Sequence, residues 1–343
     1  MNDLISQVLN QINEDSPQSV ERLSLLRTLL TRVIELGEYE TDTSELVVAA
    51  TALDELLQAA NMFSLYRESK KLAVFGSART SPESPLYDMA RRLSREMAEK
   101  GWMTVSGAGG GIMGASAEGA GTAFTLGVNI ELPFEQFPNP YIDRDSKLVE
   151  MKYFFTRKAA LTRPSNAFAI FPGGYGTLDE AFEVLTLIHT GKAEPAPVVL
   201  IDEPGGTYWA EWMDFVRHHL IRDRYIGSDD LALVRLTTSV DEAIDEIINF
   251  YLNYQRFSTA DGVGTMKLLY GPADGQLEKL ETIAPTLANG SGFSWSTPNL
   301  HFPFNGRDFV AVRRVIDEGQ WAFFQNKTCL TLEAIFGSRL ICE

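Results

Sequence analysis

Three short loops rich in glycine stand out because each could hold a phosphate group. The first is Gly76-Ser77-Ala78, the second spans residues 107–114 and the third spans residues 172–177. Glycine lets the backbone approach a ligand closely, and the N–H groups exposed at the start of a following helix form an anion site. We expect two such loops on neighbouring strands to enclose a phosphorylated ligand.

Charged side chains flank the third loop. Arg157 and Lys158 follow three aromatic residues and precede an apolar strand, so we expect at least one of them to point into the ligand cleft. A guanidinium can hold a phosphate or a departing base through two hydrogen bonds, but its pKa above about 12 makes it a poor proton donor. Glu180 and, one turn later, Glu183 place two carboxylates beside a helix start that favours phosphate.

The carboxylate of Glu180 has a second interpretation. Residues 177–180, Thr-Leu-Asp-Glu, form a capping box, in which Thr177 accepts from the N3 amide and Glu180 reaches back to the cap amide. The carboxylates here are therefore either helix caps or catalytic groups, and the sequence leaves both roles open.

The second loop also has an alternative. Gly109, Gly111 and Gly114 satisfy G-x-G-x-x-G, and Glu131 follows at about the spacing of the acid that binds ribose in dinucleotide enzymes. Against a dinucleotide site, this fingerprint follows the second predicted strand rather than the first. It also leaves the loop at 172–177 without a role.

The elements that must position these loops alternate between strand and helix. Apolar strands are predicted near residues 72–75, 102–105, 128–130, 167–171 and 198–201, with helix-like segments between them. Strands that are apolar on both faces are typical of a parallel sheet covered by helices. We therefore predict an α/β fold with a doubly wound parallel sheet, in which ligands bind at the carboxyl ends of the strands.

The chain is predicted to have three parts: a helical N-terminal segment (1–69), a nucleotide-binding catalytic domain (70–258) and a small α+β appendage (259–343). In the first part, one helix is capped at Ser16-Pro17 and stops at Gly37, and a second runs from about residue 44 to 66. In the last part, residues 266–270 favour a strand, 276–287 a helix, and 309–316 either one.

The charge balance excludes one class of partner. The 343 residues include 46 Asp plus Glu and 30 Lys plus Arg, a formal net charge of −16. Proteins that bind nucleic acid polymers present basic surfaces, because phosphate contacts dominate their affinity. A small anionic ligand is still allowed, since a few backbone N–H groups can bind one phosphate.

Neither a membrane span nor a metal site is expected. The longest apolar runs, such as residues 167–171 and 197–201, are far shorter than the roughly 20 residues that cross a bilayer, and the N-terminus lacks a basic and apolar leader. The two cysteines, Cys329 and Cys342, form no disulfide framework, and the four histidines show no ligand spacing. We expect a cytoplasmic protein without a metal or cofactor.

Four motifs together resemble a known family. Residues 155–158, Phe-Thr-Arg-Lys, and residues 172–180 resemble the paired R-K and P-G-G-x-G-T-x-x-E motifs of the LOG family, named for the plant protein LONELY GUY. The Gly76-Ser77 turn and the loop at 109–114 match in order and spacing. The resemblance covers roughly residues 70–253.

The resemblance implies a Rossmann-like fold, usually dimeric. It also implies an enzyme that uses water to cleave the N-glycosidic bond of nucleoside 5′-monophosphates, including AMP and cytokinin ribotides. The products are the free base and ribose 5-phosphate. Members are often labelled lysine decarboxylases, a label that we reject because the motifs bind phosphate and no pyridoxal-type lysine site is evident.

Carried over to this sequence, the resemblance makes Arg157 and Glu180 the catalytic pair. The residues implied or proposed to bind substrate are Gly76, Ser77, Gly109, Gly110, Gly111, Met113, Lys158, Gly173, Gly174, Gly176, Thr177 and Glu183. Two departures are visible: Leu161 replaces a methionine of the family pattern, a nearly volume-conserving change, and residues 132–141 are expected to form a longer flap over the base.

Cleavage of a ribosyl C–N bond builds positive charge on the sugar, as in glycosidases. Our hypothesis is that Glu180 stabilises that charge and orients or deprotonates water, with Glu183 as a helper, while Arg157 binds phosphate or the departing base. Three alternatives stay open: a nicotinamide-dependent oxidoreductase, a carrier of a phosphorylated cofactor such as a molybdopterin derivative, and a regulatory protein whose appendage senses an effector.

Overall fold

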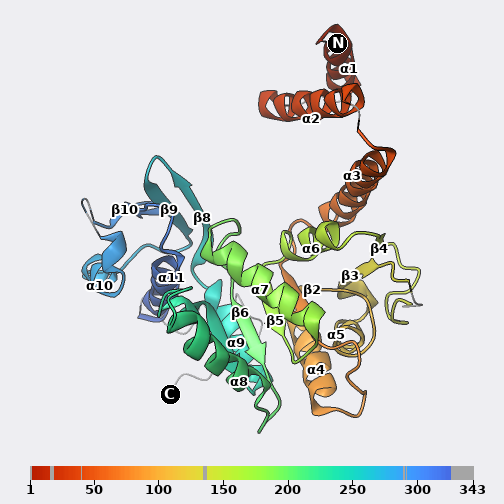
Figure 1. Cartoon of the computed structure of the whole chain (residues 1–343). Coiled ribbons are helices and arrows are strands. Elements are labelled where there is room, and N and C mark those ends of the chain that lie inside the picture. The colour runs from red at the N-terminus through yellow and green to blue at the C-terminus, as the bar shows by residue number, and fades with distance from the viewer. Residues whose placement is uncertain are drawn as a thin grey trace. The chain divides into compact units, whose positions relative to one another are not determined.

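The computed structural model describes residues 2–15, 19–39, 41–133, 137–288, 290 and 292–325. The chain divides into two compact units, Met1–Leu57 and Gln58–Glu343. The second unit holds both the large sheet and the C-terminal segment (Figure 1). The three domains expected from the sequence, with boundaries after residues 69 and 258, stay a prediction. Both cysteines and the Ser16-Pro17 pair lie outside the described residues.

The N-terminal segment is helical, as predicted. Helix α1 (Asn2–Asp15) packs against α2 (Val20–Glu38), and α3 (Thr43–Ser64) follows. The cap of α2 is Ser19, whose hydroxyl accepts a hydrogen bond from the Arg22 amide at 3.2 Å. The expected stop at Gly37 lies one residue before the end of this helix.

Among the described helices, α3 is long and apolar enough, at 22 residues, to span a bilayer. Length and composition are the only grounds for that, and one such helix is weak evidence for a membrane span. Its C-terminal end carries the buried residues Ala59 and Met62, which pack into the core of the second unit.

Seven parallel strands form the central sheet, in the order β4-β3-β2-β1-β5-β6-β7. The strands are β1 (Lys71–Phe75), β2 (Met103–Ser106), β3 (Thr125–Ile130), β4 (Leu148–Met151), β5 (Ala167–Ile170), β6 (Val198–Ile201) and β7 (Val234–Thr237). After β4 the chain crosses to the other side of β1, so β1 marks the point at which the strand order reverses. Ligands bind at such switch points, and the predicted fold class is confirmed.

The two strands of this sheet that the sequence analysis missed, β4 and β7, are its edge strands. The five predicted strands are buried along their whole length, whereas β4 and β7 each expose one residue and leave others half-buried. A strand covered on only part of its surface needs no continuous apolar run, which is why the pattern did not reveal them.

Helices cover both faces of the sheet (Figure 1). On one face lie α6 (Phe154–Thr162), α7 (Tyr175–His189) and α8 (Tyr208–Phe215), and on the other α4 (Pro85–Glu99), α5 (Ile112–Ala120) and α9 (Val240–Phe250). Side chains of β1 alternate between the two cores: Ala73 and Phe75 join the first, and Leu72 and Val74 the second. Short helical turns complete the unit at η1 (Thr122–Phe124), the π-helix η2 (Val216–Ile221), η3 (Asp230–Leu233) and η4 (Pro285–Leu287).

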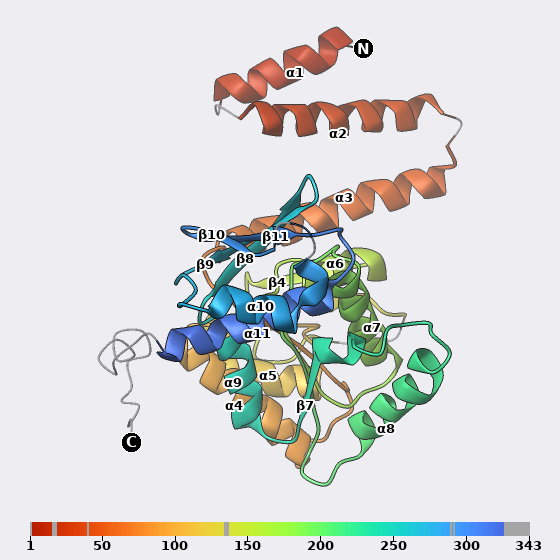
Figure 2. The same ribbon diagram turned by 90° about the vertical axis from the view of Figure 1, so that its left-hand side faces the viewer.

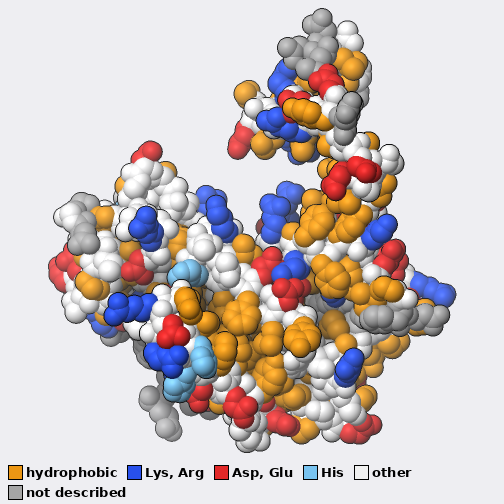
Figure 3. All heavy atoms as spheres, viewed as in Figure 1, with side chains coloured by type: hydrophobic (Ala, Val, Ile, Leu, Met, Phe, Trp, Pro, Cys, Tyr) orange, Lys and Arg blue, Asp and Glu red, His pale blue; other side chains and the backbone are white. Residues whose placement is uncertain are grey.

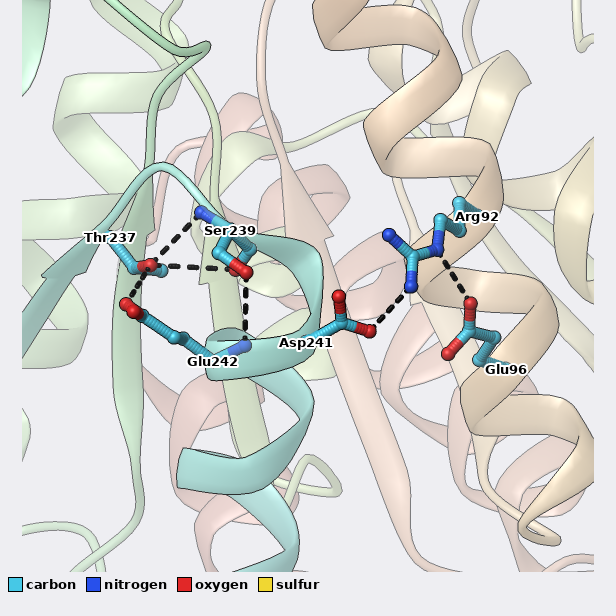
Figure 4. A network of polar contacts seen from close by, with 6 residues as sticks. All are labelled: Arg92, Glu96, Thr237, Ser239, Asp241 and Glu242. Atoms are coloured by element: carbon cyan, nitrogen blue, oxygen red, sulfur yellow. Dashed lines mark hydrogen bonds and ion pairs between the residues drawn. The ribbon is translucent and has the colours of Figure 1, made fainter.

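Polar contacts join α4 to α9 at the surface (Figure 4). Arg92 of α4 bonds Glu96, at 2.7 Å, and also Asp241 in the first turn of α9. The start of α9 is fixed by Ser239, which accepts from the Glu242 amide at 3.3 Å, while the Glu242 carboxylate accepts from Thr237 at 2.6 Å. The Ser239 amide in turn donates to the Thr237 hydroxyl at 3.0 Å, so Ser239 and Thr237 each satisfy one amide that a helix start leaves unpaired.

The C-terminal segment is α+β, as predicted. Its antiparallel sheet has the order β10-β11-β9-β8 and consists of β8 (Tyr254–Ala260), β9 (Val263–Leu268), β10 (Ser294–Ser296) and β11 (Asn299–Pro303). Helices α10 (Gln276–Ile283) and α11 (Phe309–Gln325) pack on it around buried phenylalanines (Figure 2). The ambiguous segment 309–316 is therefore helical.

Candidate active site

A cavity of about 830 Å³ opens at the carboxyl edge of the large sheet. Its wall is built from the first and third predicted loops, from α6 and from the first turns of α7. Of the predicted site residues, those that line it are Gly76, Ser77, Met113, Arg157, Gly173, Gly174, Gly176, Thr177 and Glu180. The fold thus brings together residues from four separate stretches of the sequence.

The first and third loops are joined directly. The Ser77 amide donates to the Pro172 carbonyl at 3.1 Å, and the Tyr208 hydroxyl donates to the Gly173 carbonyl at 2.6 Å. A Cβ atom on Gly173 would lie 2.1 Å from the Thr177 hydroxyl oxygen and 2.9 Å from the Ser77 nitrogen. Only glycine fits at this position, because the two loops pack this closely.

Helix α7 begins earlier than the sequence suggested. Its first residue is Tyr175, its N-cap is Gly174, and no side chain caps it. The capping-box interpretation was therefore wrong: Thr177 and Glu180 lie inside the helix, because the backbone already turns helical at the glycines. Tyr175, Gly176 and Thr177, whose amides have no partner within the helix, line the cavity.

Arg157 projects from α6 and is held by backbone carbonyls. Its Nε donates to the Val128 carbonyl at 3.0 Å, and one terminal nitrogen donates to the Gly107 carbonyl at 3.3 Å. A Cβ on Gly107 would lie 2.1 Å from that terminal nitrogen, so this glycine makes room for the guanidinium. Burial lowers the pKa of Arg157, and the charge of Glu180 opposes that shift.

Glu180 is 7% exposed, and its Oε2 atom has no hydrogen-bond partner among the described residues. Burial raises the pKa of Glu180 to about 7, while the positive charge of Arg157 works in the opposite direction. The two side chains interact electrostatically across the cavity without a direct ion pair. A carboxyl group with a pKa this close to neutrality can act as a general base.

Lys158 does not line this cavity. Its ammonium group, on the neighbouring position of α6, binds Asp179 at 2.9 Å and Glu183 at 3.1 Å on α7. Adjacent positions on a helix point about 100° apart, so only one member of the Arg157–Lys158 pair can face the ligand. Lys158 and Glu183 tie the two helices together.

The second loop contributes less to the cavity than expected. Gly107 and Met113 line it, but Gly109, Gly110 and Gly111 do not. Gly111 has φ +57°, and a Cβ there would lie 2.2 Å from the Ser77 carbonyl oxygen, so its role is close packing against the first loop. This arrangement gives the glycines a structural use that needs no dinucleotide.

The predicted flap lies partly outside the described residues, at 134–136. On one side of that gap Leu132 lines the cavity. On the other, the buried Asn139 donates from its backbone amide to the Ala108 carbonyl at 2.7 Å and from its side chain to the Gly109 carbonyl at 3.2 Å. The flap is thus anchored to the second loop.

Several cavity residues were not among the predicted site residues, namely Arg79, Gly107, Phe154, Tyr175 and Asp179. Each lies within three residues of a predicted site residue, and that proximity is the one signal that could have found them.

Hydrophobic side chains gather over α7 and α8 on the face drawn in Figure 3. Among residues at the cavity, Phe154 is 54% and Tyr175 95% exposed. Within the described residues, no group of three or more His, Cys, Asp or Glu could hold a metal ion.

Comparison with known proteins identifies relatives of the sheet domain. A protein-family profile described as "Possible lysine decarboxylase" matches residues 110–247. The cytokinin riboside 5′-monophosphate phosphoribohydrolase of Mycobacterium marinum is 35% identical over 136 residues, covering 38% of this chain and 69% of that protein. The protein of the same name from Mycobacterium tuberculosis is 31% identical over 138 residues, covering 39% and 71%.

Among solved structures, the molybdenum cofactor carrier protein of Chlamydomonas reinhardtii is similar, at 22% identity and a TM-score of 0.34. The match covers 51% of this chain and 94% of that one. Family membership rests on the mycobacterial relatives, since each is more than 30% identical to this chain over more than two thirds of its own length. This chain is therefore a member of the LOG family.

Proposed function

We propose that the chain hydrolyses the N-glycosidic bond of nucleoside 5′-monophosphates and releases the free base and ribose 5-phosphate. The observation that carries the proposal is Glu180: a buried carboxylate with an unpartnered oxygen that shares a cavity with Arg157. Family membership and the names of the mycobacterial relatives support the same reaction class.

The first turn of α7 binds the 5′-phosphate in this proposal. Its amides at Tyr175, Gly176 and Thr177 are free of side-chain caps, and the positive end of the helix dipole favours an anion. These local donors act at hydrogen-bond range. The repulsion from a net charge of −16 is screened beyond about 8 Å at physiological salt.

Chemistry then takes place at the anomeric carbon. Ionised Glu180 faces the positive charge that develops on the ribose and accepts a proton from the attacking water, whose oxygen bonds to C1′. The electron pair of the C–N bond leaves with the base, which takes up a proton. Arg157 stabilises negative charge on the phosphate or on the departing base.

The direct test is to incubate the purified protein with a panel of nucleoside monophosphates, including AMP and a cytokinin ribotide, and to measure free base by chromatography. Turnover supports the proposal, and the panel gives the base preference. Tight binding of a phosphorylated ligand with no turnover of any nucleotide favours the carrier function instead. Binding of NAD with no release of base favours the oxidoreductase.

We further expect a homo-oligomer in the cytoplasm. The exposed aromatic residues Phe154, Phe155, Tyr175 and Phe182 support self-association, because monomers rarely expose a large apolar patch. Light scattering on the purified protein measures the assembly size, and a monomer at micromolar concentration would contradict this expectation.

Replacement of Glu180 by Gln should lower kcat by about 10²- to 10⁴-fold, because it removes the base and the stabilising charge. Above pH 7 the same variant should melt at a higher temperature than the wild type. The folded state holds the proton of Glu180 up to a pKa of about 7 rather than 4.5, so stability is lost as the pH rises through that interval. A Glu99→Gln change on the exposed end of α4 serves as control. Full activity in a folded Glu180→Gln protein would refute the assignment.

The activity should increase with pH. Because ionised Glu180 is the active form and its pKa is raised to about 7, kcat/KM for AMP should rise between pH 5.5 and 8 and level off above that range. Initial rates across this interval measure the curve. A profile that is flat down to pH 5.5 would mean that no group with a raised pKa takes part.

A Gly176→Ala change should weaken substrate binding without lowering the stability of the fold. The added Cβ meets no atom within 4 Å and stands in the second helical position of α7, where alanine favours the helix, so the melting temperature should stay or rise. The methyl group projects where the phosphate is proposed to bind, so KM should increase at least about tenfold. Gly319→Ala in α11, equally open, is the control. An unchanged KM would place the phosphate elsewhere.

A further inference from the structure

A second cavity, of about 520 Å³, lies at the amino ends of the strands of the large sheet, whereas the first lies at their carboxyl ends. Three of its lining residues, Lys70, Asn166 and Ala196, come directly before or near the starts of β1, β5 and β6. The other walls are the ends of α6 and α7 and the start of β8. Its volume falls in the usual range for small-molecule sites, about 300–1,000 Å³.

Positive charge faces this cavity without a matching negative charge. Lys70, Arg163 and Lys192 line it, and none of them forms an ion pair with a carboxylate in the described part of the chain. Of the two lining carboxylates, Glu183 is already paired with Lys158 at 3.1 Å, and Glu194 interacts with Arg256. Three unpaired cations at one place are unexpected in a chain of net charge −16.

Two tyrosines form the wall beside these cations. The Lys70 ammonium lies 4.1 Å from the centre of the Tyr251 ring, whose hydroxyl donates to the Asn166 carbonyl at 2.6 Å. Tyr254 is 2% exposed, and its hydroxyl makes no hydrogen bond of normal geometry with the described residues, having only a weak backbone interaction at Phe257. A buried hydroxyl without a full partner is costly.

Burial also disfavours the charge on Lys70, since it lowers the pKa of that ammonium group. An anion bound beside Lys70 would reverse this effect by compensating the charge. The three cations beside the tyrosine wall therefore favour an anionic ligand.

The same two helices line both cavities. Helix α6 places Arg157 in the first cavity, and Arg163, the residue that follows this helix, lines the second. Helix α7 places Glu180 in the first cavity and Glu183 in the second. The Lys158 ammonium joins these helices between the two sites. A ligand that moves either helix at one edge of the sheet therefore moves a catalytic group at the other.

We propose that this second cavity binds a small polyanion of nucleotide size, with its phosphates on Lys70, Arg163 and Lys192, and that its occupancy changes the activity of the catalytic pair through α6 and α7. The binding stands on the cavity alone, whereas the effect on activity rests on the proposed function.

The binding test uses isothermal titration of the full chain with two probes, ATP and inorganic triphosphate. The Arg163→Gln/Lys192→Gln variant should weaken binding of at least one probe about tenfold or more. The matched Arg95→Gln/Lys100→Gln variant, which removes the same charge from exposed positions on α4 and at its C-cap, should bind within about twofold of the wild type. Binding of triphosphate as tight as that of ATP would show that the phosphate chain is recognised, and tighter binding of ATP that the nucleoside contributes.

An Arg157→Ala variant changes the first cavity only, so it should bind both probes with the affinity of the wild type. The proposal is overturned if neither probe binds the wild type, if the Arg163→Gln/Lys192→Gln variant binds as tightly as the wild type, or if binding is lost in Arg157→Ala alone.

The coupling test compares kcat/KM for AMP with and without saturating triphosphate. We expect a change of at least about threefold in the wild type and none in the Arg163→Gln/Lys192→Gln variant. Hydrogen exchange of α6 and α7 gives a readout that needs no turnover, and triphosphate should alter it in the wild type only. Binding without a change in either readout would overturn the coupling. Absence of nucleotidase activity with altered exchange would contradict the proposed function and leave this site intact.

Discussion

A buried carboxylate beside a buried guanidinium is the constraint on which the site depends. Glu180 has lost most of its contact with water, and one of its oxygens has no partner among the described residues. Burying such a group is unfavourable unless its charge is compensated, and here Arg157 compensates it only in part, so the pKa settles near 7. In a site selected for stability alone, the two side chains would form a direct ion pair or would be replaced by apolar residues.

The fold holds these two groups in place from separate elements. Arg157 is fixed by two backbone carbonyls, at Val128 and Gly107, and Glu180 is fixed by its position on α7, whose start is set by the glycines after β5. The bond between the Ser77 amide and the Pro172 carbonyl joins the loops that bring β1 and β5 to one edge. The rigid sheet thus determines the spacing of the catalytic pair, which loops alone could not do.

Much of the fold and of the candidate site was predictable from the sequence. Strands buried on both faces have continuous apolar runs, and glycines follow two of these strands at 76–78 and 172–177, the loop at 172–177 leading directly into α7. The sheet and the main cavity therefore followed from local pattern. The edge strands β4 and β7 lack that pattern. The direction of the Lys158 side chain could not be predicted from the sequence, because its partners on α7, Asp179 and Glu183, are 21 and 25 positions away. The second cavity joins residues from 70 to 255, a grouping that only the folded chain reveals.

The central claim is that Glu180 is a carboxyl group held near neutrality for catalysis. Carbon-13 NMR of glutamate-labelled protein, titrated between pH 4 and 9, tests this most directly. The account predicts one carboxyl resonance with an apparent pKa of about 7 that is absent from Glu180→Gln and shifts when ribose 5-phosphate is added. A protein in which every glutamate titrates below about pH 5.5, as exposed carboxyls do, would contradict it.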